Sequence, residues 1–374
     1  MIRMKKNDFI VFLYALCIIP FLGIFGIKNL VGANIYSLFQ VFSFCTSLII
    51  LFIYLEKNRI KINLYLILLL CYELLSILVT IAYHRFSFGV FIVCANGVVL
   101  SGLIISDPKK MLKAITIVSI LTAIINFLSI VKYGVDEYSQ YFIGGKNSFT
   151  AFLIPTLIYG LINMCNNKLK YFILILLLMI TIVPIILTSS GTGIIVSFFC
   201  IILLFFKKII QNKWELILII FTINFFLLLF NNLLFDNEVW INITSLLGKS
   251  STLTDRNVIW RLAENYFFEH PFFGIGRGYE LIYINKLGKY NVVMESHNMI
   301  LEILVSTGFL GILLFMSCFF LSVKRINLQK KSEKYIYILI ILFFINGLTE
   351  SIGNNYLFLF TMAFANAKLG EIYG

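Results

Sequence analysis

Long apolar runs recur along the whole chain, with short polar segments between them. A run near 20 residues is the length of helix that crosses a bilayer core of about 30 Å. The pattern predicts twelve spans, at residues 9–27, 35–55, 62–83, 87–106, 112–131, 148–165, 169–187, 190–206, 214–233, 297–322, 335–352 and 354–369.

One long polar segment, residues 234–296, interrupts this pattern. The sequence therefore predicts an all-α polytopic membrane protein in three parts. Transmembrane helices 1–9 fill residues 1–233, a large helical loop fills 234–296, and transmembrane helices 10–12 fill 297–374.

Composition and charge agree with a membrane protein. Hydrophobic residues make up 60% of the chain and charged residues 13%, whereas a soluble domain carries about 25% charged residues. The net charge is +12, and most of the Lys and Arg residues lie in every second one of the short segments between the spans. The positive-inside rule then places both termini in the cytoplasm and the large loop outside. Most of the charge follows topology, so we expect the bilayer and no nucleic acid as a partner.

Several kinds of chemistry are excluded by missing motifs. The seven cysteines all lie within apolar runs and form no CxxC pair, so neither disulfides nor a zinc site are predicted. No Walker motif occurs, so ATP hydrolysis by the chain is not expected. No DxD motif occurs either, which argues against metal-dependent chemistry on nucleotide sugars. The sequence thus predicts no cofactor and no metal, and we expect the chemistry in the outer loop.

The first part of the loop has the signals of a helix. Thr252 can cap it with Asp255 three residues on, and the run RNVIWRLAENYFFE stops before Pro271. Arg261 points away from the main face. That face, by helical spacing, holds Arg256, Trp260, Ala263 and Phe267.

A glycine-rich turn at residues 273–278 follows, and then Glu295, Ser296, His297 and Asn298 come directly before a long apolar helix. His297 therefore lies at a helix N-terminus at the outer membrane boundary. The dipole there disfavours a protonated imidazole, so a neutral histidine could act as a general base. Nearby arginines could hold a diphosphate as it leaves.

These segments resemble the C-terminal signature of the O-antigen ligase/polymerase (Wzy-type) superfamily over about a fifth of the chain. The residues that match its motif are Arg256 at the helix start, Trp260, the turn glycines Gly274 and Gly276, the pair His297 and Asn298, and the helix glycines Gly308 and Gly311. The resemblance implies a GT-C-type, metal-independent glycosyltransferase of the bacterial plasma membrane. Its implied substrates are undecaprenyl-diphosphate-linked sugars on the outer face.

One departure concerns the phosphate. The family often has Ser-Arg at the outer end of an earlier span, but here residues 188–193 read TSSGTG. The phosphate role then falls to one of a small set: Arg256, Arg261, Arg277, Lys146, or the backbone of Gly191 and Gly193.

From these patterns we predict two groups of site residues. The catalytic candidates are His297, Arg256 and Glu295, and the substrate-binding candidates are Arg261, Arg277, Trp260 and Asn298. A cation at a helix start opposes the dipole, which favours a functional role for Arg256. A tryptophan at the position of Trp260 is more often a packing residue than a surface on which a sugar ring stacks. For Arg261 and Arg277, a functional and a purely structural role are equally supported by the sequence.

Three carboxylates need separate consideration. Glu302 is more than one turn beyond His297, so Glu295 is the better partner for that histidine. Glu350 lies near the outer end of a span and could face the same cavity. Glu73 lies within a span, where it is either functional or paired with a polar residue such as Asn126.

The function predicted is a polysaccharide polymerase that joins lipid-linked repeat units. A composition rich in Ile, Lys, Asn and Phe suggests an organism of low GC content, which favours a capsule over an O-antigen as the product. A chain-length regulator and a flippase are further expected partners. A ligase that moves finished glycan to another acceptor shares the motifs. A transporter would spread charges and inverted repeats through the spans, and a scaffold gives no reason for clustering Arg256, Arg277 and His297.

Overall fold

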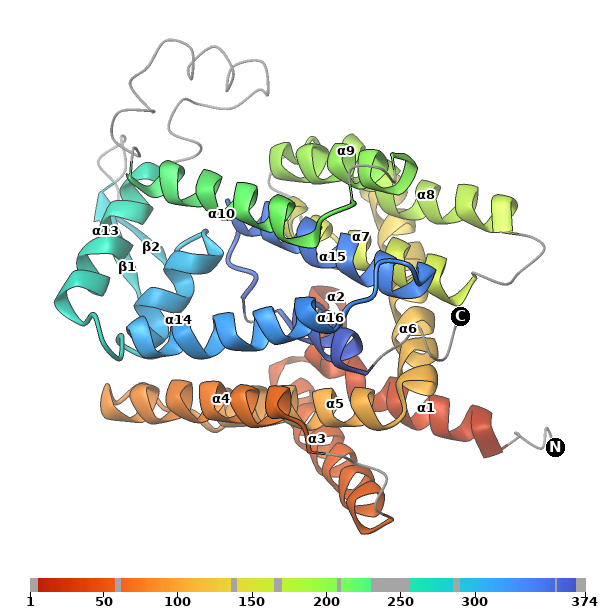
Figure 1. Cartoon of the computed structure of the whole chain (residues 1–374), viewed down its shortest axis with the longest axis horizontal. Helices are drawn as coiled ribbons and strands as arrows, with labels where there is room; N and C mark the ends of the chain where they lie inside the picture. The colour runs from red at the N-terminus through yellow and green to blue at the C-terminus, as the bar shows by residue number, and fades with distance from the viewer. Residues whose placement is uncertain are drawn as a thin grey trace.

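A computed structural model describes residues 6–57, 62–135, 140–164, 170–206, 210–229, 256–284, 290–353 and 355–367. The predicted cap at Thr252 and Asp255 and the loop residues 234–255 lie outside these ranges. Helices dominate the described part (Figure 1). Those before the loop are α1 (Lys6–Ile18), the 3-10 helix η1 (Ile19–Phe21), α2 (Phe25–Val31), α3 (Ala33–Glu56), α4 (Leu64–Ala82), α5 (Phe88–Ser106), α6 (Pro108–Tyr133), α7 (Lys146–Asn163), α8 (Lys170–Leu187), α9 (Gly191–Phe205) and α10 (Lys213–Leu229).

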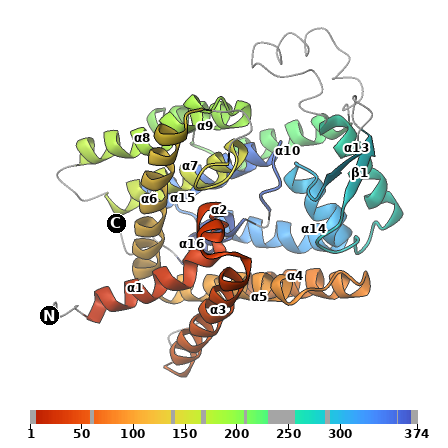
Figure 2. The ribbon, with the colours of Figure 1, turned by 180° about the vertical axis from the view of Figure 1, so that it is seen from behind.

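The second half follows as α13 (Arg256–Glu269), strands β1 (Leu281–Ile284) and β2 (Tyr290–Val293), α14 (Met299–Arg325), α15 (Lys331–Gly347) and α16 (Tyr356–Asn366). Helix α13 and the two strands lie together at one end of the molecule, and the start of α1 lies at the other end (Figures 1 and 2). The described part of the loop therefore forms a cap on one end of the helical bundle.

Each of the twelve predicted spans contains a helix. Among the described residues, five of these helices are long and apolar enough to cross a membrane: α3, α4, α5, α6 and α14. A sixth span is counted if the bent pair at the N-terminus is one span. The helices support an all-α membrane protein, while the number of twelve spans remains a prediction.

The first predicted span, residues 9–27, is not one straight helix. The chain turns by 90° between η1 and α2. Pro20 lies inside η1 and removes a backbone donor, and Gly23 has a φ of +67°, a left-handed conformation that ends the helix. The bend therefore follows from two residues that the apolar pattern alone does not weigh.

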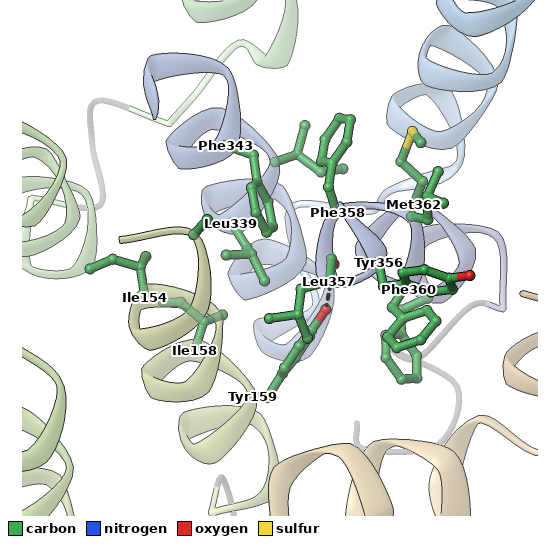
Figure 3. Close-up of a cluster of buried hydrophobic side chains, with 14 of the residues drawn as sticks. Ile154, Ile158, Tyr159, Leu339, Phe343, Tyr356, Leu357, Phe358, Phe360 and Met362 are labelled. Atoms are coloured by element: carbon green, nitrogen blue, oxygen red, sulfur yellow. Dashed lines mark hydrogen bonds between the residues drawn. The ribbon is translucent and has the colours of Figure 1, made fainter. Parts of the chain in front are cut away.

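The last predicted span, residues 354–369, forms a much shorter helix. All 11 residues of α16 are buried, and a helix of this length rises only about 16 Å. The aromatic rings of α16 interleave with those of α15, as in the Phe343–Phe358 pair at 5.1 Å between centroids (Figure 3). Tyr159 of α7 donates a hydrogen bond to the Leu357 carbonyl at 3.1 Å. Helix α16 is thus a central core element.

The outer loop is not wholly helical, which corrects the sequence prediction. Strands β1 and β2 pair antiparallel, with Leu281 opposite Val293. Leu281 is buried and its neighbour Ile282 is exposed, as the two-residue period of a strand requires. Two four-residue strands are too short to give a clear alternating pattern in the sequence.

The glycine-rich turn fits into a break in α14. Gly308 has a φ of +63°, so α14 is interrupted there. The freed backbone groups are bonded by the turn: Ile275 donates to the Val305 carbonyl at 2.8 Å, and Phe309 donates to the Pro271 carbonyl at 2.8 Å. A Cβ added at Gly308 would lie 2.4 Å from the Phe272 carbonyl carbon. The glycine-rich turn and the glycine break at Gly308 therefore contact each other, and the contact supplies hydrogen-bond partners for the backbone groups that the break leaves free.

Candidate functional site

A cavity of about 420 Å³ lies where four separate segments meet. These are the bend after α1, the start of α7, the residues before α14, and the connection from α15 to α16. The lining residues are Leu22, Gly23, Ile143, Asn147, Ser148, Ala151, Phe152, Glu295, His297, Glu350, Ser351, Ile352 and Asn355.

One wall of the cavity was not predicted from the sequence. Gly26 donates a hydrogen bond to the Phe142 carbonyl at 2.8 Å, and Phe25 donates to the Ile143 carbonyl at 3.4 Å. These bonds join the bend after α1 to the segment before α7. Only Gly23, through its turn-forming character, gives a sequence signal for this wall.

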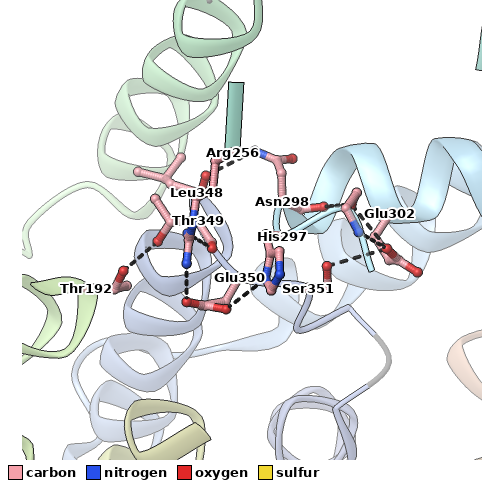
Figure 4. Close-up of polar contacts among 10 residues, drawn as sticks. Thr192, Arg256, His297, Asn298, Glu302, Leu348, Thr349, Glu350 and Ser351 are labelled. Carbon is pink, nitrogen blue, oxygen red and sulfur yellow. Dashed lines mark hydrogen bonds and ion pairs between the residues drawn. The ribbon is translucent and has the colours of Figure 1, made fainter. Parts of the chain in front are cut away.

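The opposite wall carries a chain of polar contacts from His297 through Glu350 to Arg256 (Figure 4). The His297 Nδ1 lies 3.4 Å from Glu350 Oε2, and the Arg256 guanidinium donates to Glu350 Oε1 at 2.7 Å. Arg256 also donates to the Thr349 carbonyl. Glu350 thus joins two of the predicted catalytic residues.

The geometry leaves one histidine nitrogen available. The His297 backbone is left-handed, with a φ of +53°, and 29% of its side chain is exposed. Its Nε2 makes no hydrogen bond to the residues that the structure describes. A carboxylate on Nδ1 orients the ring and leaves Nε2 able to accept a proton.

The contacts of Glu350 suit a carboxylate, because the Arg256 guanidinium lies at 2.7 Å from Oε1 and the His297 ring nitrogen at 3.4 Å from Oε2. The sequence favours Glu295 as the partner of His297, whereas in the structure the residue that contacts the His297 ring is Glu350.

Glu295 lines the same cavity, and its carboxyl group has a raised pKa. Although its side chain reaches open space, burial by the surrounding protein and the charges of Glu302 and Glu350 raise its pKa to about 7, while His297 lowers it. A carboxyl group of this kind exchanges a proton near neutral pH.

We expect Glu295→Gln to change how stability depends on pH. A carboxyl group with a pKa of about 7 in the fold and 4.5 in its ordinary state makes a contribution to stability that is fully present below pH 4.5. That contribution is lost as the pH rises through 7, because the folded protein must then hold an ionised carboxylate close to the charges of Glu302 and Glu350. Thermal unfolding in detergent from about pH 4 to about pH 8 should show the wild type losing stability relative to the variant across this window. Parallel curves would contradict the altered pKa.

Glu302 organises the loop that carries His297, a role the sequence did not reveal. Its Oε2 accepts bonds from the Ser296 backbone N–H at 2.9 Å, the Ser296 hydroxyl at 3.1 Å and the Ser351 hydroxyl at 3.4 Å. Tyr279 donates a further bond at 2.5 Å. Glu302 therefore holds the residues next to His297 and Glu350 against the first turn of α14.

Asn298, predicted to bind substrate, caps a helix in the structure. Its Oδ1 accepts from the backbone N–H groups of Ile300 and Leu301, and its Nδ2 donates to Asn224 and to the Leu348 carbonyl. The side chain is fully buried with both ends bonded. It fixes the start of α14, and hence His297, and it is not among the described residues that line the cavity.

Trp260 and Arg261 also lie away from the cavity. Trp260 is completely buried among Ile259, Ala263 and Tyr279, so its ring faces have no access for a sugar and the packing interpretation is correct. Arg261 is exposed on the other side of α13, as helical spacing predicts, and it does not line the cavity.

Arg277 is paired inside the bundle. Its guanidinium donates to Glu73 at 2.7 Å and to the Ser76 hydroxyl at 2.7 Å. The alternative partner that we considered for Glu73, Asn126, accepts instead from the Ile143 backbone. Arg277 thus anchors the glycine-rich turn to α4 and does not line the cavity.

Residues 188–193, which lack the expected arginine, connect to Arg256 from the side. Ser190 caps α9 by accepting from the Gly193 backbone N–H. Thr192 is bonded to the Thr349 hydroxyl at 2.8 Å, and the carbonyl of Thr349 accepts from Arg256. The segment therefore supports the polar chain through its hydroxyl groups.

Comparison with known proteins agrees with the motif. No curated protein matches the chain. The family model described as O-antigen ligase matches residues 174–316, a range that includes Arg256, the glycine-rich turn, His297 and the break in α14. Glu350 lies beyond it. The match over this range confirms the resemblance to the O-antigen ligase/polymerase superfamily that the sequence motif indicates.

Proposed function

We propose that the protein is a polysaccharide polymerase acting on the outer face of the plasma membrane, with capsule as the favoured product. It transfers a growing glycan from undecaprenyl diphosphate to the terminal sugar of a new lipid-linked repeat unit. The observation that carries the proposal is a cavity in which His297 is oriented by Glu350, while Glu350 is held by Arg256.

The reaction needs one proton acceptor. The hydroxyl oxygen of the new unit attacks the anomeric carbon and forms the new C–O bond, while its proton passes to His297 Nε2. The bond from the anomeric carbon to the diphosphate breaks, and the diphosphate leaves with that electron pair. Glu350 stabilises the imidazolium that forms. These steps require no metal.

The structure changes the role that we propose for Arg256. Its side chain is 11% exposed and lies behind Glu350, and it is not among the described residues that line the cavity. Arg256 is therefore a positioning residue that fixes the Glu350 carboxylate. Arg261 and Arg277 are also absent from the described lining.

A ligase is the second candidate, because the matched family model is described by that activity. It would use the same histidine on a different acceptor hydroxyl. The two functions differ in product: a polymerase makes a ladder of lengths on one lipid, and a ligase moves a glycan to a second carrier.

The polar chain can be tested in cells that lack the gene. We expect Arg256→Met and Glu350→Gln to reduce polymer formation by about 10²-fold. A general base that is poorly oriented loses a rate enhancement of about this size. Single lipid-linked repeat units should accumulate. Polymer length on gels, with membrane protein levels checked, measures the effect.

Arg261→Met is the matched control, because it removes an exposed arginine from the same helix. This variant should make full-length polymer. If Arg256→Met and Glu350→Gln also make full-length polymer at normal membrane levels, the proposed site is wrong.

A further inference from the structure

A second groove, of about 520 Å³, lies away from the cavity, between α4 and the turn after α13. Its lining is almost entirely apolar. The residues are Leu75, Leu78, Val79, Ala82, Tyr83, His270, Pro271, Phe272, Phe273 and Gly274. None of them lines the candidate site.

Three phenylalanines at the end of α13 and in the turn after it are exposed, and two of them, Phe272 and Phe273, line the groove. Phe268 is 74% exposed, Phe272 69% and Phe273 57%. They lie at the end of α13 and in the turn at residues 270–274, outside every predicted span. A cluster of exposed aromatic rings in water is an aggregation liability, and in native proteins it marks a surface that something apolar covers.

The groove continues the outer surface of a membrane helix. Leu70, Leu74, Leu78 and Ile81 of α4 are all exposed, and their spacing places them on one stripe of a helix that can cross the bilayer. Leu78 belongs both to this stripe and to the groove. The apolar surface therefore runs without interruption from α4 to Phe272 and Phe273.

The far edge of the groove is polar and basic. The Tyr83 hydroxyl is bonded to His270 Nδ1 at 2.9 Å. Arg85 lies 5.8 Å from the centre of the Tyr83 ring and donates to the Ile275 carbonyl at 2.9 Å, and its side chain is exposed. Tyrosine and arginine in this order, beyond an apolar stripe, are typical of the boundary between acyl chains and headgroups.

We propose that the turn at residues 270–274 and the end of α13 are embedded in the outer leaflet, and that the groove binds one acyl chain of a phospholipid. Phe268, Phe272 and Phe273 enter the hydrocarbon, and Arg85 faces the phosphate of the headgroup. Hydrocarbon is the occupant that matches an apolar lining, a continuous lipid-facing stripe and a cationic rim together. Because the same turn closes the break in α14, the bilayer then fixes the height of that helix and of His297 at its start.

Photo-crosslinking tests this directly. The full-length protein with p-benzoylphenylalanine in place of Phe272, or in place of Phe268, is reconstituted in vesicles of phosphatidylethanolamine and phosphatidylglycerol. After irradiation, intact mass identifies the adduct. The control carries the same probe in place of Arg261, which is exposed about two turns before Phe268 on α13 and lies outside the groove lining.

We expect phospholipid adducts at positions 268 and 272 and none at 261. Two outcomes would overturn the proposal. The first is the absence of lipid adducts at both positions, with the probe bonded only to the protein itself. The second arises in vesicles that also contain polyprenyl diphosphate: if the polyprenyl lipid replaces phospholipid in the adduct, the groove holds a substrate tail.

Discussion

Replacing His297 with asparagine is expected to lower the rate of glycosyl transfer by about 10²–10⁴-fold, the range in which a general base contributes. Asparagine is the informative choice because His297 has a φ of +53°, and asparagine tolerates the left-handed conformation. The backbone can therefore stay in place while the proton acceptor is lost. Glu350 would still be held by Arg256.

His84 provides a matched control. It also has a positive φ, of +54°, and it lies outside the cavity lining. His84→Asn should keep wild-type activity. Elongation of a lipid-linked repeat unit by the purified variants measures both rates. If His297→Asn keeps a rate close to that of His84→Asn, His297 is not the base.

The largest effect on stability is expected from Arg277→Met. This substitution leaves Glu73 buried, with 4% of its side chain exposed and without its cationic partner. Breaking a buried ion pair on one side costs about 3–5 kcal/mol. Glu73→Gln added to Arg277→Met removes the uncompensated charge and should recover most of the loss. Chemical unfolding in mixed micelles measures both variants.

The double variant also separates two roles for Arg277. If Arg277 only anchors the glycine-rich turn, as the structure indicates, restored stability should bring restored polymer formation. A double variant that folds well and is inactive would show that Arg277 acts on the substrate, as the sequence analysis had allowed.

Local periodicity explains which parts of the site could be predicted. Spacing along α13 placed Arg256 and Trp260 on the inner face and Arg261 outside, and the structure confirms this arrangement. His297 was correctly located at the start of α14, because an apolar run begins directly after it. Both inferences depend on residues within about two helical turns of each other.

The pairs that define the site could not be predicted in this way. Arg256 and Glu350 are 94 residues apart, and Arg277 and Glu73 are 204 apart. Sequence spacing carries no information on such contacts, because they depend on how the helices pack. For the same reason spacing alone could not show that the side chain of Asn298 is buried and contacts Asn224.

The break in α14 shows a further limit. Gly308 reads as an ordinary glycine in an apolar helix, and its left-handed φ becomes intelligible only through its contact with Phe272. The bend at Gly23 is likewise explained by a distant contact, because it lets the backbone of Gly26 bond to the Phe142 carbonyl and close one wall of the cavity. Glycines were visible in the sequence, but the backbones that they approach were not.

The most direct test of the account uses the purified protein in vesicles, with a lipid-linked repeat unit as the only glycan. We expect a ladder of products that remain attached to the polyprenyl diphosphate, with one polyprenyl diphosphate released for each bond formed. Transfer only to a different, non-polyprenyl carrier when one is supplied, with no ladder in its absence, would contradict the polymerase and establish the ligase.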